Sequence, residues 1–201
     1  MRRALFFMLV VGCGSKQDAA TPADPPKVAS GSPVESYFPL DHGKLYTYAT
    51  HEGAENGTVS FKVERPDPTH GKLVVVGSNS AKRFVYEKDG VAYDGGGAYI
   101  LKAPLEVGTA WPGEHGGQLK IVKTDATASG ADGKSYSSCI VTQEDGTRPP
   151  GSRYTTTYCP GVGMVLFEVV TNQGDAKGEL KYYGPPIKME SGTSVKIEKS
   201  Q

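Results

Sequence analysis

The sequence predicts a mainly β fold: a single domain of antiparallel strands, arranged as a sandwich or as a partly closed half-barrel. Short apolar segments recur along the chain, separated by turns that draw on 26 glycines and 14 prolines. Tyrosine outnumbers phenylalanine by 11 to 6. Aromatic and β-branched residues favour strands, whereas glycine and proline favour turns, so long helices are not expected.

The charge balance excludes one class of partner. Lys plus Arg and Asp plus Glu both number 22, so there is no basic excess to attract nucleic acid. The continuous apolar stretch at residues 4–11 is far shorter than the roughly 20 residues that span a bilayer as a helix. We therefore predict no membrane-spanning helix.

The first residues have the layout of an export signal. Arg2 and Arg3 precede the apolar stretch, and Val10-Val11-Gly12-Cys13 follows it. These four residues resemble a lipobox, which implies cleavage before Cys13 and acylation of its thiol, palmitate included. Residues 1–12 are then a lipoprotein signal peptide. A plain secretory signal and a buried N-terminal strand are the alternatives.

Acylation of Cys13 would anchor the chain to a membrane. The resemblance implies three acyl chains, and stable anchoring needs two or more. Gly14 differs from the aspartate that, in enteric bacteria, accompanies retention in the inner membrane. We therefore expect a location in the cell envelope, on the outer membrane and facing the periplasm.

The remaining chain divides into three parts. Residues 13–36 contain no aromatic residue and are rich in proline, which predicts a disordered tether behind the lipidated cysteine. Residues 37–184 form the β domain. Residues 185–201 form a C-terminal tail or add one edge strand.

The first strands are predicted to form a hairpin. Asn56-Gly57 is the strongest short signal for a two-residue turn, because both turn positions need a positive φ. Such a turn places Thr50 opposite Val63. One face of the hairpin then carries Tyr46, Tyr48, Thr50, Val59, Phe61 and Val63. Two separate strands therefore agree on which face is the core.

Further strand candidates follow at short spacing. They are Leu73–Gly77, Arg83–Glu87, Val91–Tyr93, Ala98–Lys102, Gln118–Lys123, Tyr136–Thr142, Arg153–Cys159, Val162–Thr171 and Glu179–Tyr183. Turn signals such as Asp89-Gly90, Asp132-Gly133 and Asp145-Gly146 separate them. Residues 162–171 lack alternation, which predicts a central strand covered on both faces.

One short motif occurs twice. Residues 39–46 and 104–111 both read Pro-Leu-acid-x-Gly-x-x-aromatic, and we call this the Pro-Leu turn motif. A duplicated ligand motif is one interpretation. We favour a recurrent way to lead into a strand, in which glycine takes the tight turn and Tyr46 or Trp111 enters the core.

Two cysteines remain once Cys13 is assigned to lipid. If Tyr136–Thr142 and Arg153–Cys159 form a hairpin that pairs Val141 with Thr157, Cys139 and Cys159 lie directly opposite. We predict a structural disulfide between them, in keeping with an oxidising compartment. Two buried free thiols and a redox pair are alternatives, the second disfavoured because the chain has no Cys-x-x-Cys motif.

The sequence predicts no catalytic residue, no metal site and no cofactor. His42, His51, His70 and His115 lack the spacing of metal ligands. The common nucleophile and phosphate-binding motifs are missing too. Asp125 with Asp132, or Asp89 with Asp94, lacks the alternating oxygen ligands of a calcium loop.

Aromatic side chains leave one kind of binding site open. A groove for a sugar or an aromatic ligand could be lined by Trp111, Tyr93, Tyr99, Tyr154, Tyr182 and Tyr183. Packing in the core or on a sheet face is favoured, because these residues are ordinary strand formers.

Three segments resemble a widespread group of uncharacterised bacterial lipoproteins. They are Tyr37-Phe38-Pro39-Leu40-x-x-Gly43-x-x-Tyr46-x-Tyr48, then Pro104-Leu105-x-x-Gly108-x-x-Trp111, then Tyr158-Cys159-Pro160-Gly161-Val162-Gly163-Met164-Val165. The usual opening of that family has tryptophan where this chain has Tyr46. The resemblance covers most of residues 37–170. It implies structural motifs but no activity.

Two functions of different classes fit these observations. The first is a non-catalytic envelope module that binds a protein, a glycan or a wall component on an exposed sheet face or edge. The alternative is a periplasmic carrier of lipid or another apolar ligand inside a curved half-barrel. A continuous apolar cavity of several hundred Å³ would favour the carrier, and a filled interior with a flat aromatic patch would favour the surface-binding module.

Overall fold

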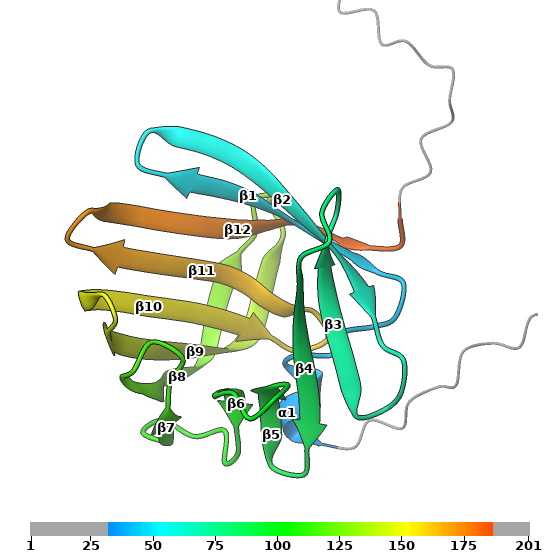
Figure 1. Ribbon diagram of the computed structural model, residues 1–201, viewed down its shortest axis with the longest axis horizontal. Helices are drawn as coiled ribbons and strands as arrows, with labels where there is room; N and C mark the ends of the chain where they lie inside the picture. The colour runs from blue at the N-terminus through cyan, green and yellow to red at the C-terminus, as the bar shows by residue number, and fades with distance from the viewer. Residues whose placement is uncertain (1–31, 187–201) are drawn as a thin grey trace, which may run out of the picture.

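The computed structural model describes residues 32–186, which form one antiparallel sheet of twelve strands. The strand order is β6-β5-β4-β3-β2-β1-β12-β11-β10-β9-β8-β7. The sheet curves until it is nearly closed into a barrel (Figure 1). The predicted β fold is therefore confirmed, as a partly closed barrel. The predicted signal peptide, Cys13 and residues 187–201 of the tail lie outside the described residues.

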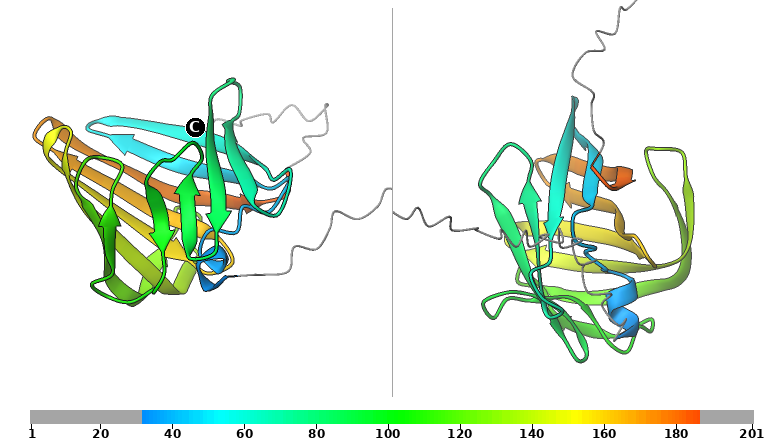
Figure 2. Two further views of the ribbon diagram at one scale, coloured as in Figure 1. Left: turned by 60° about the horizontal axis from the view of Figure 1, so that its bottom comes forward. Right: turned by 90° about the vertical axis from the view of Figure 1, so that its right-hand side faces the viewer.

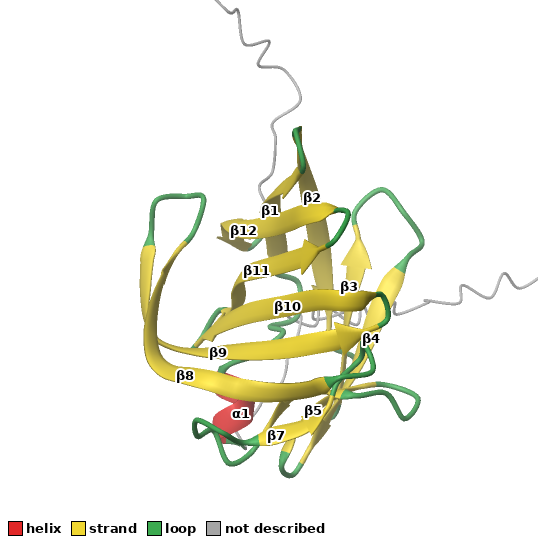
Figure 3. Ribbon diagram, turned by 90° about the vertical axis from the view of Figure 1, so that its left-hand side faces the viewer, coloured by secondary structure: helices red, strands yellow, loops and turns green. Residues whose placement is uncertain are grey.

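The sheet consists of two meanders of consecutive strands. The N-terminal half-sheet contains β1 (Leu45–Glu52), β2 (Glu55–Glu64), β3 (His70–Val75), β4 (Ala81–Glu87), β5 (Gly90–Tyr93) and β6 (Tyr99–Lys102). The C-terminal half-sheet contains β7 (Ala110–Pro112), β8 (Gln118–Ser129), β9 (Ser135–Thr147), β10 (Pro150–Cys159), β11 (Gly163–Thr171) and β12 (Gly174–Gly184). Pairing of β1 with β12 joins the halves, and β6 and β7 are the two edges. Figures 2 and 3 show the half-sheets facing each other across the interior.

The strands differ from the predicted ones mainly in length. Strands β8, β9 and β12 extend beyond their predicted bounds, and the short strand β7 was not predicted. Asp145-Gly146 was predicted as a turn but lies inside β9, where Asp145 pairs with Arg153 and Gly146 with Ser152. The chain turns at Arg148-Pro149, beside the turn signal that Pro149-Pro150-Gly151 provides, so β9 continues past the Asp-Gly pair.

The predicted turn of the first hairpin is wrong. The chain turns at Gly53-Ala54, so Thr50 faces Gly57 and not Val63. This earlier turn leaves β1 paired along its other edge with β12, up to Glu52 opposite Ala176. The predicted shared face is nevertheless correct, because the shift in register is an even number of residues and keeps every side chain on its side.

The domain begins earlier than predicted. Residues 33–36 were assigned to the disordered tether, but Pro33–Ser36 forms a helical turn, α1. The Ser32 hydroxyl accepts a hydrogen bond from the Val34 N–H at 3.3 Å, and the Val34 side chain is fully buried. Burial of Val34 gives this segment the apolar contact that its composition did not indicate.

Arg65 binds both α1 and the segment that follows it. Its guanidinium donates hydrogen bonds to Glu35 Oε1 at 2.6 Å, to the Pro39 carbonyl at 2.7 Å and to the Pro68 carbonyl at 2.7 Å. The guanidinium also lies 4.1 Å from the centre of the Tyr86 ring. These contacts hold residues 35–39 across one end of the sheet, where α1 lies beside β5 in Figure 1.

The predicted disulfide between Cys139 and Cys159 is present, with a Cα–Cα distance of 4.2 Å. The register is the predicted one, because Val141 pairs with Thr157 and Ile140 with Tyr158. The disulfide closes the open end of the β9–β10 hairpin. Both sulfur atoms lie in the core, since each cysteine is at most 1% exposed.

Both copies of the Pro-Leu turn motif lead into a strand. Gly43 has a φ of +81° and donates to the Val63 carbonyl at 3.0 Å. Gly108 has a φ of +94° and donates to the Ile121 carbonyl at 2.9 Å. The aromatic residues that follow, Tyr46 and Trp111, are buried. The structural interpretation of the repeat is therefore confirmed.

Strand β11 is central, as predicted, with β10 and β12 on its two sides. It is not covered on both faces. Val169 faces the interior cavity described below, while Val170 is 48% exposed on the outer face. Among residues 32–186, no helix is long and apolar enough to cross a membrane.

Candidate functional site

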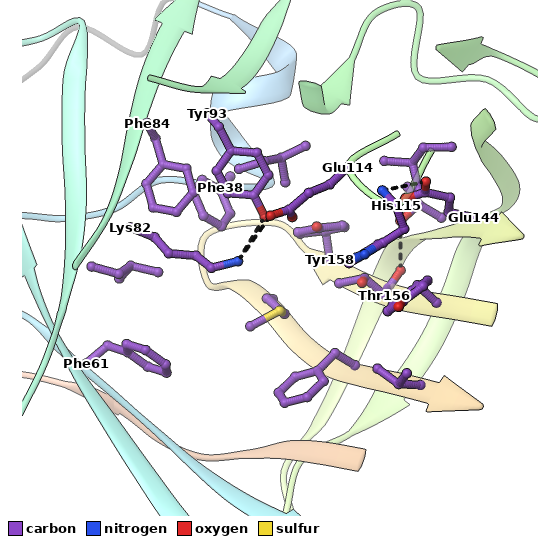
Figure 4. Close-up of a pocket in the computed structure, with 18 of the residues that line it drawn as sticks. Phe38, Phe61, Lys82, Phe84, Tyr93, Glu114, His115, Glu144, Thr156 and Tyr158 are labelled. Atoms are coloured by element: carbon purple, nitrogen blue, oxygen red, sulfur yellow. Dashed lines mark hydrogen bonds and ion pairs between the residues drawn. The ribbon is translucent and has the colours of Figure 1, made fainter. Parts of the chain in front are cut away.

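A cavity of about 500 Å³ lies between the two half-sheets (Figure 4). This volume falls within the roughly 300–1,000 Å³ of small-molecule sites. Strands from both halves line the cavity, together with Phe38 from the segment after α1 and the β7–β8 loop. Several of the lining side chains are only half-buried, so the cavity is accessible to solvent.

One part of the lining, which we call the apolar wall, is hydrophobic. It consists of Val59, Phe61, Leu73, Val75, Phe84, Met164, Phe167 and Val169. Paired strands align these side chains: Phe61 faces Val75 across β2 and β3, and Phe38 packs edge-on against Phe84 at 5.1 Å between ring centres. Phe61 and Phe167 stay partly exposed, so a bound apolar group would remove them from water.

The opposite part of the lining, the polar end, contains Lys82, Glu114, His115, Thr142, Glu144 and Thr156. Strands β9 and β10 bring three of these together, because Thr142 pairs with Thr156 and Glu144 with Tyr154. The same alternation that directs apolar residues inward on β2 and β4 therefore directs hydroxyls and a carboxylate inward here.

Glu144 is the buried charge of the polar end, with 2% of its surface exposed. Its Oε1 accepts hydrogen bonds from the backbone N–H groups of His115 at 2.8 Å and Gly117 at 3.0 Å. Gly113 packs directly on the carboxylate, and any Cβ there would overlap it. Glu144 therefore fixes the β7–β8 loop over the cavity.

The fixed loop presents two side chains to the cavity. The His115 ring stacks on the Tyr154 ring, with centres 3.4 Å apart and planes 6° from parallel. Glu114 lies 3.8 Å from the ammonium of Lys82, which projects from β4 of the other half-sheet. This ion pair crosses the solvent-exposed rim of the cavity. Because both side chains are largely exposed, it adds little stability.

Two tyrosines beside the polar end stay uncharged. Burial raises the pKa of Tyr93, and the neighbouring Tyr158 and Glu114 raise it further. Burial likewise raises the pKa of the Tyr158 phenol. Both side chains therefore remain neutral hydrogen-bonding groups at physiological pH. The Lys82 ammonium lies 5.0 Å from the centre of the Tyr93 ring.

The edge strands β6 and β7 meet beside this cavity, and we call their junction the seam. Among the described strands they are the two that have a ladder partner on one side only. The Trp111 indole on β7 donates a hydrogen bond to the Tyr99 carbonyl on β6 at 2.8 Å. A side chain, and not a backbone ladder, therefore links the two edges.

The structure separates the aromatic candidates named from sequence. Tyr93, Tyr99 and Tyr154 line the cavity, whereas Trp111 is buried in the core beneath β7. Tyr183 lies elsewhere and donates to Asp41 at 2.8 Å. Of the histidines, His115 lines the cavity. Within residues 32–186, no group of three or more His, Cys, Asp or Glu side chains could hold a metal ion.

Sequence reasoning missed Lys82 and Glu144, which line the cavity from strands β4 and β9. A signal for each is present in the sequence. Lys82 shares the alternation of Phe84 and Tyr86, and Glu144 shares that of Thr142. A charged residue in register with the core face of a strand marks either a paired buried group or the wall of a cavity.

Comparisons with known proteins give the following. No protein-family profile matches the chain, and no curated protein does. A solved Bacteroides fragilis protein, described as exported with a YmcC-like fold, aligns at TM-score 0.47 and 9% identity, over 72% of this chain and 96% of that one. LprF from Mycobacterium bovis aligns at TM-score 0.33 and 13% identity, over 80% of this chain and 94% of that one.

Proposed function

We propose that this chain is an exported, lipid-anchored envelope protein that carries an apolar or amphiphilic ligand in the cavity between its half-sheets. The cavity of about 500 Å³ with its apolar wall is the observation that carries the proposal. Burial of apolar surface supplies roughly 25 cal/mol per Å², so a chain-like apolar ligand gains most by covering Phe61 and Phe167.

The carrier fits the described residues better than a module that binds partners on its outer face. The large hydrophobic side chains that are exposed on residues 32–186 are Val76, Val107 and Val170. They lie on three separate elements, and scattered single residues of this kind are ordinary on protein surfaces. The partly exposed side chains of Phe61, Tyr154 and Phe167, by contrast, line the cavity.

The proposed role is binding without catalysis. The Glu144 carboxylate is engaged by the backbone of the β7–β8 loop, and the His115 ring is stacked on Tyr154. These groups position the loop and shape the polar end. A carrier needs no nucleophile, metal ion or cofactor, and we assign none.

The proposed address rests on the sequence. The signal layout and the lipobox-like residues before Cys13 support export and acylation, and the absence of aspartate at Gly14 supports the outer membrane, facing the periplasm. Metabolic labelling with palmitate tests the anchor. We expect label on the wild-type chain and none on Cys13→Ser; label on both would contradict the assignment of Cys13.

Adjacent valines on β11 give a matched test of the cavity. Val169 lines the cavity, whereas Val170 is exposed on the outer face. Val169→Arg places a charge within the apolar wall, and Val170→Arg places the same charge in solvent. The full-length chain with Cys13→Ser, purified with its disulfide formed, would be titrated with the uncharged fluorescent probe N-phenylnaphthylamine.

We expect the wild-type cavity and Val170→Arg to bind the probe alike. Val169→Arg should bind at least about tenfold more weakly, since a buried unpaired charge is costly. Thermal unfolding followed by circular dichroism would establish that both variants are folded. Equal probe binding by two folded variants would contradict the carrier.

A further inference from the structure

The two chemical regions of the cavity draw unequally on the half-sheets, since five of the eight side chains of the apolar wall come from the N-terminal half-sheet and Met164, Phe167 and Val169 come from β11. The N-terminal half-sheet supplies Val59, Phe61, Leu73 and Phe84 to the apolar wall. The polar end is built on β9, β10 and the β7–β8 loop of the C-terminal half-sheet, with Lys82 reaching across the rim (Figure 4). A ligand that fills the cavity therefore meets apolar side chains along one part and hydrogen-bonding groups at the other.

The Glu144 carboxylate at the polar end has one oxygen that the β7–β8 loop does not use. Both hydrogen bonds that Glu144 receives from described residues go to Oε1, which leaves Oε2 without a partner among residues 32–186. The Thr142 hydroxyl already donates to the Thr156 carbonyl, at 3.4 Å. A polar group entering this end thus finds a carboxylate oxygen that can accept a further hydrogen bond.

The charges at the polar end are unbalanced. Two acidic side chains, Glu114 and Glu144, lie at the polar end against one lysine, Lys82. The ammonium of Lys82 is also shared between Glu114 and the Tyr93 ring. An anionic headgroup would therefore approach two carboxylates and would have to displace one of them from Lys82.

From this arrangement we infer that the ligand is an amphiphile with an apolar tail and a headgroup that donates hydrogen bonds and is not anionic: a hydroxyl or an ammonium group. The tail lies along the apolar wall, and the headgroup donates to Glu144 at the polar end. This inference rests on the proposed carrier function. A carboxylate or phosphate headgroup is disfavoured by repulsion from Glu144 and Glu114.

Three probes with the same alkyl chain test this inference: dodecylamine, dodecanol and dodecanoate. Each would be titrated below its micelle concentration, at neutral pH, into the full-length Cys13→Ser chain, with binding followed by calorimetry. We expect the ammonium and the alcohol to bind at least about tenfold more tightly than the carboxylate, because like charges a few ångströms apart repel by several RT at intermediate dielectric.

Two substitutions locate the origin of the selectivity. Glu144→Gln keeps an Oε1 that accepts from the β7–β8 loop but removes the charge, and Glu114→Gln frees Lys82. Each should weaken the amine and strengthen dodecanoate, so that the preference falls to less than about a third of the wild-type ratio. Glu55→Gln, in the exposed end of the β1–β2 hairpin, is the matched control and should change nothing.

The outcomes separate the two proposals. Equal binding of all three probes, with Val169→Arg still weakening each, would overturn the headgroup inference and leave the carrier standing. Tightest binding of dodecanoate would also overturn it and would assign the headgroup to Lys82. Failure of every probe to bind would overturn the carrier and the headgroup inference together.

Discussion

The two half-sheets are both six-stranded meanders that begin with a Pro-Leu turn motif, yet they differ in strand length and in what fixes them. Strands β3 to β6 have four to seven residues, whereas β8, β9 and β10 have ten to thirteen. The C-terminal half-sheet carries the disulfide. The N-terminal half-sheet has no crosslink and is held instead by Arg65 and the segment after α1.

This difference shows that the same turn motif can lead into two half-sheets whose inward-facing side chains differ in chemistry. The turn determines only how the chain leads into its first strand and where one aromatic side chain is buried. What each half contributes to the cavity depends on the residues that alternate inward farther along the strands. Four perturbations test whether different contacts stabilise the two half-sheets.

The largest effect is expected at Arg65 in the N-terminal half-sheet. Arg65→Ala leaves Glu35 and two carbonyls without their donor, and removal of one partner from a buried ion pair costs about 3–5 kcal/mol. Urea unfolding would measure this loss. Arg153→Ala, which breaks an exposed ion pair with Asp145 on the C-terminal half-sheet, is the control and should cost less than about 1 kcal/mol. Similar losses in both variants would contradict the proposed role of Arg65.

The next effect concerns the C-terminal half-sheet. Replacing Cys139 and Cys159 together by alanine removes the disulfide, which links residues 20 positions apart. We expect the free energy of unfolding to fall by around 3 kcal/mol, because the unfolded chain gains conformational entropy. Hydrogen exchange should then rise in β9 and β10 before it rises in β3 and β4. Faster exchange spread evenly over both half-sheets would mean that they unfold as one unit.

A smaller and equal effect is expected at the two turns. Gly43→Ala and Gly108→Ala each place a Cβ at a positive φ, and at both positions nothing lies within 4 Å of that atom. The cost is then one of backbone conformation alone, about 1–2 kcal/mol at each site. Denaturant midpoints would compare the two variants. Unequal losses would show that the two turns are not structurally equivalent.

The smallest effect is expected on the pH dependence of stability. Burial opposes ionisation of Asp41, but hydrogen bonds from Lys44 and Tyr183 outweigh it, so the pKa of Asp41 lies below its ordinary value of 3.8. A depressed pKa stabilises the fold fully above the unfolded value, and this contribution is lost as the pH falls through the folded pKa. Because Asp41 is half-exposed, the change should stay below about 1 kcal/mol.

Urea unfolding between about pH 3 and pH 7 would measure this contribution. Asp41→Asn should flatten the pH dependence by that amount. Glu106→Gln, at the corresponding position of the second Pro-Leu turn motif, is the control. If Asp41→Asn and the wild-type chain lost stability in parallel on acidification, the hydrogen bonds to Asp41 would not be the cause.

The fold could largely be predicted from sequence, because its strands and the disulfide follow from local patterns. The first turn could not. Gly53-Ala54 and Asn56-Gly57 both provide a glycine for a tight turn, and pairing of β1 with β12, over a hundred residues away, decides between them. The start of the domain was also missed, since burial of Val34 depends on distant strands.

The site was less predictable than the fold. A cavity exists only because the sheet curves until its halves face each other, and no single strand encodes that closure. Lys82 and Glu144 look like ordinary polar positions until the register places them on the inner face. The headgroup chemistry therefore becomes visible only when strands from both halves are seen together.

The seam between β6 and β7 bears on the size of the ligand that the proposed carrier would hold. Separating these two edges would break the Trp111–Tyr99 hydrogen bond and the exposed Lys82–Glu114 contact while every strand ladder stays intact. Side-chain contacts, which include the packing of Tyr99 and Leu105 against the cluster around Trp111, thus hold the two edges together in place of backbone pairing. A barrel closed in this way would widen around a thicker ligand of the proposed carrier at the loss of side-chain contacts alone.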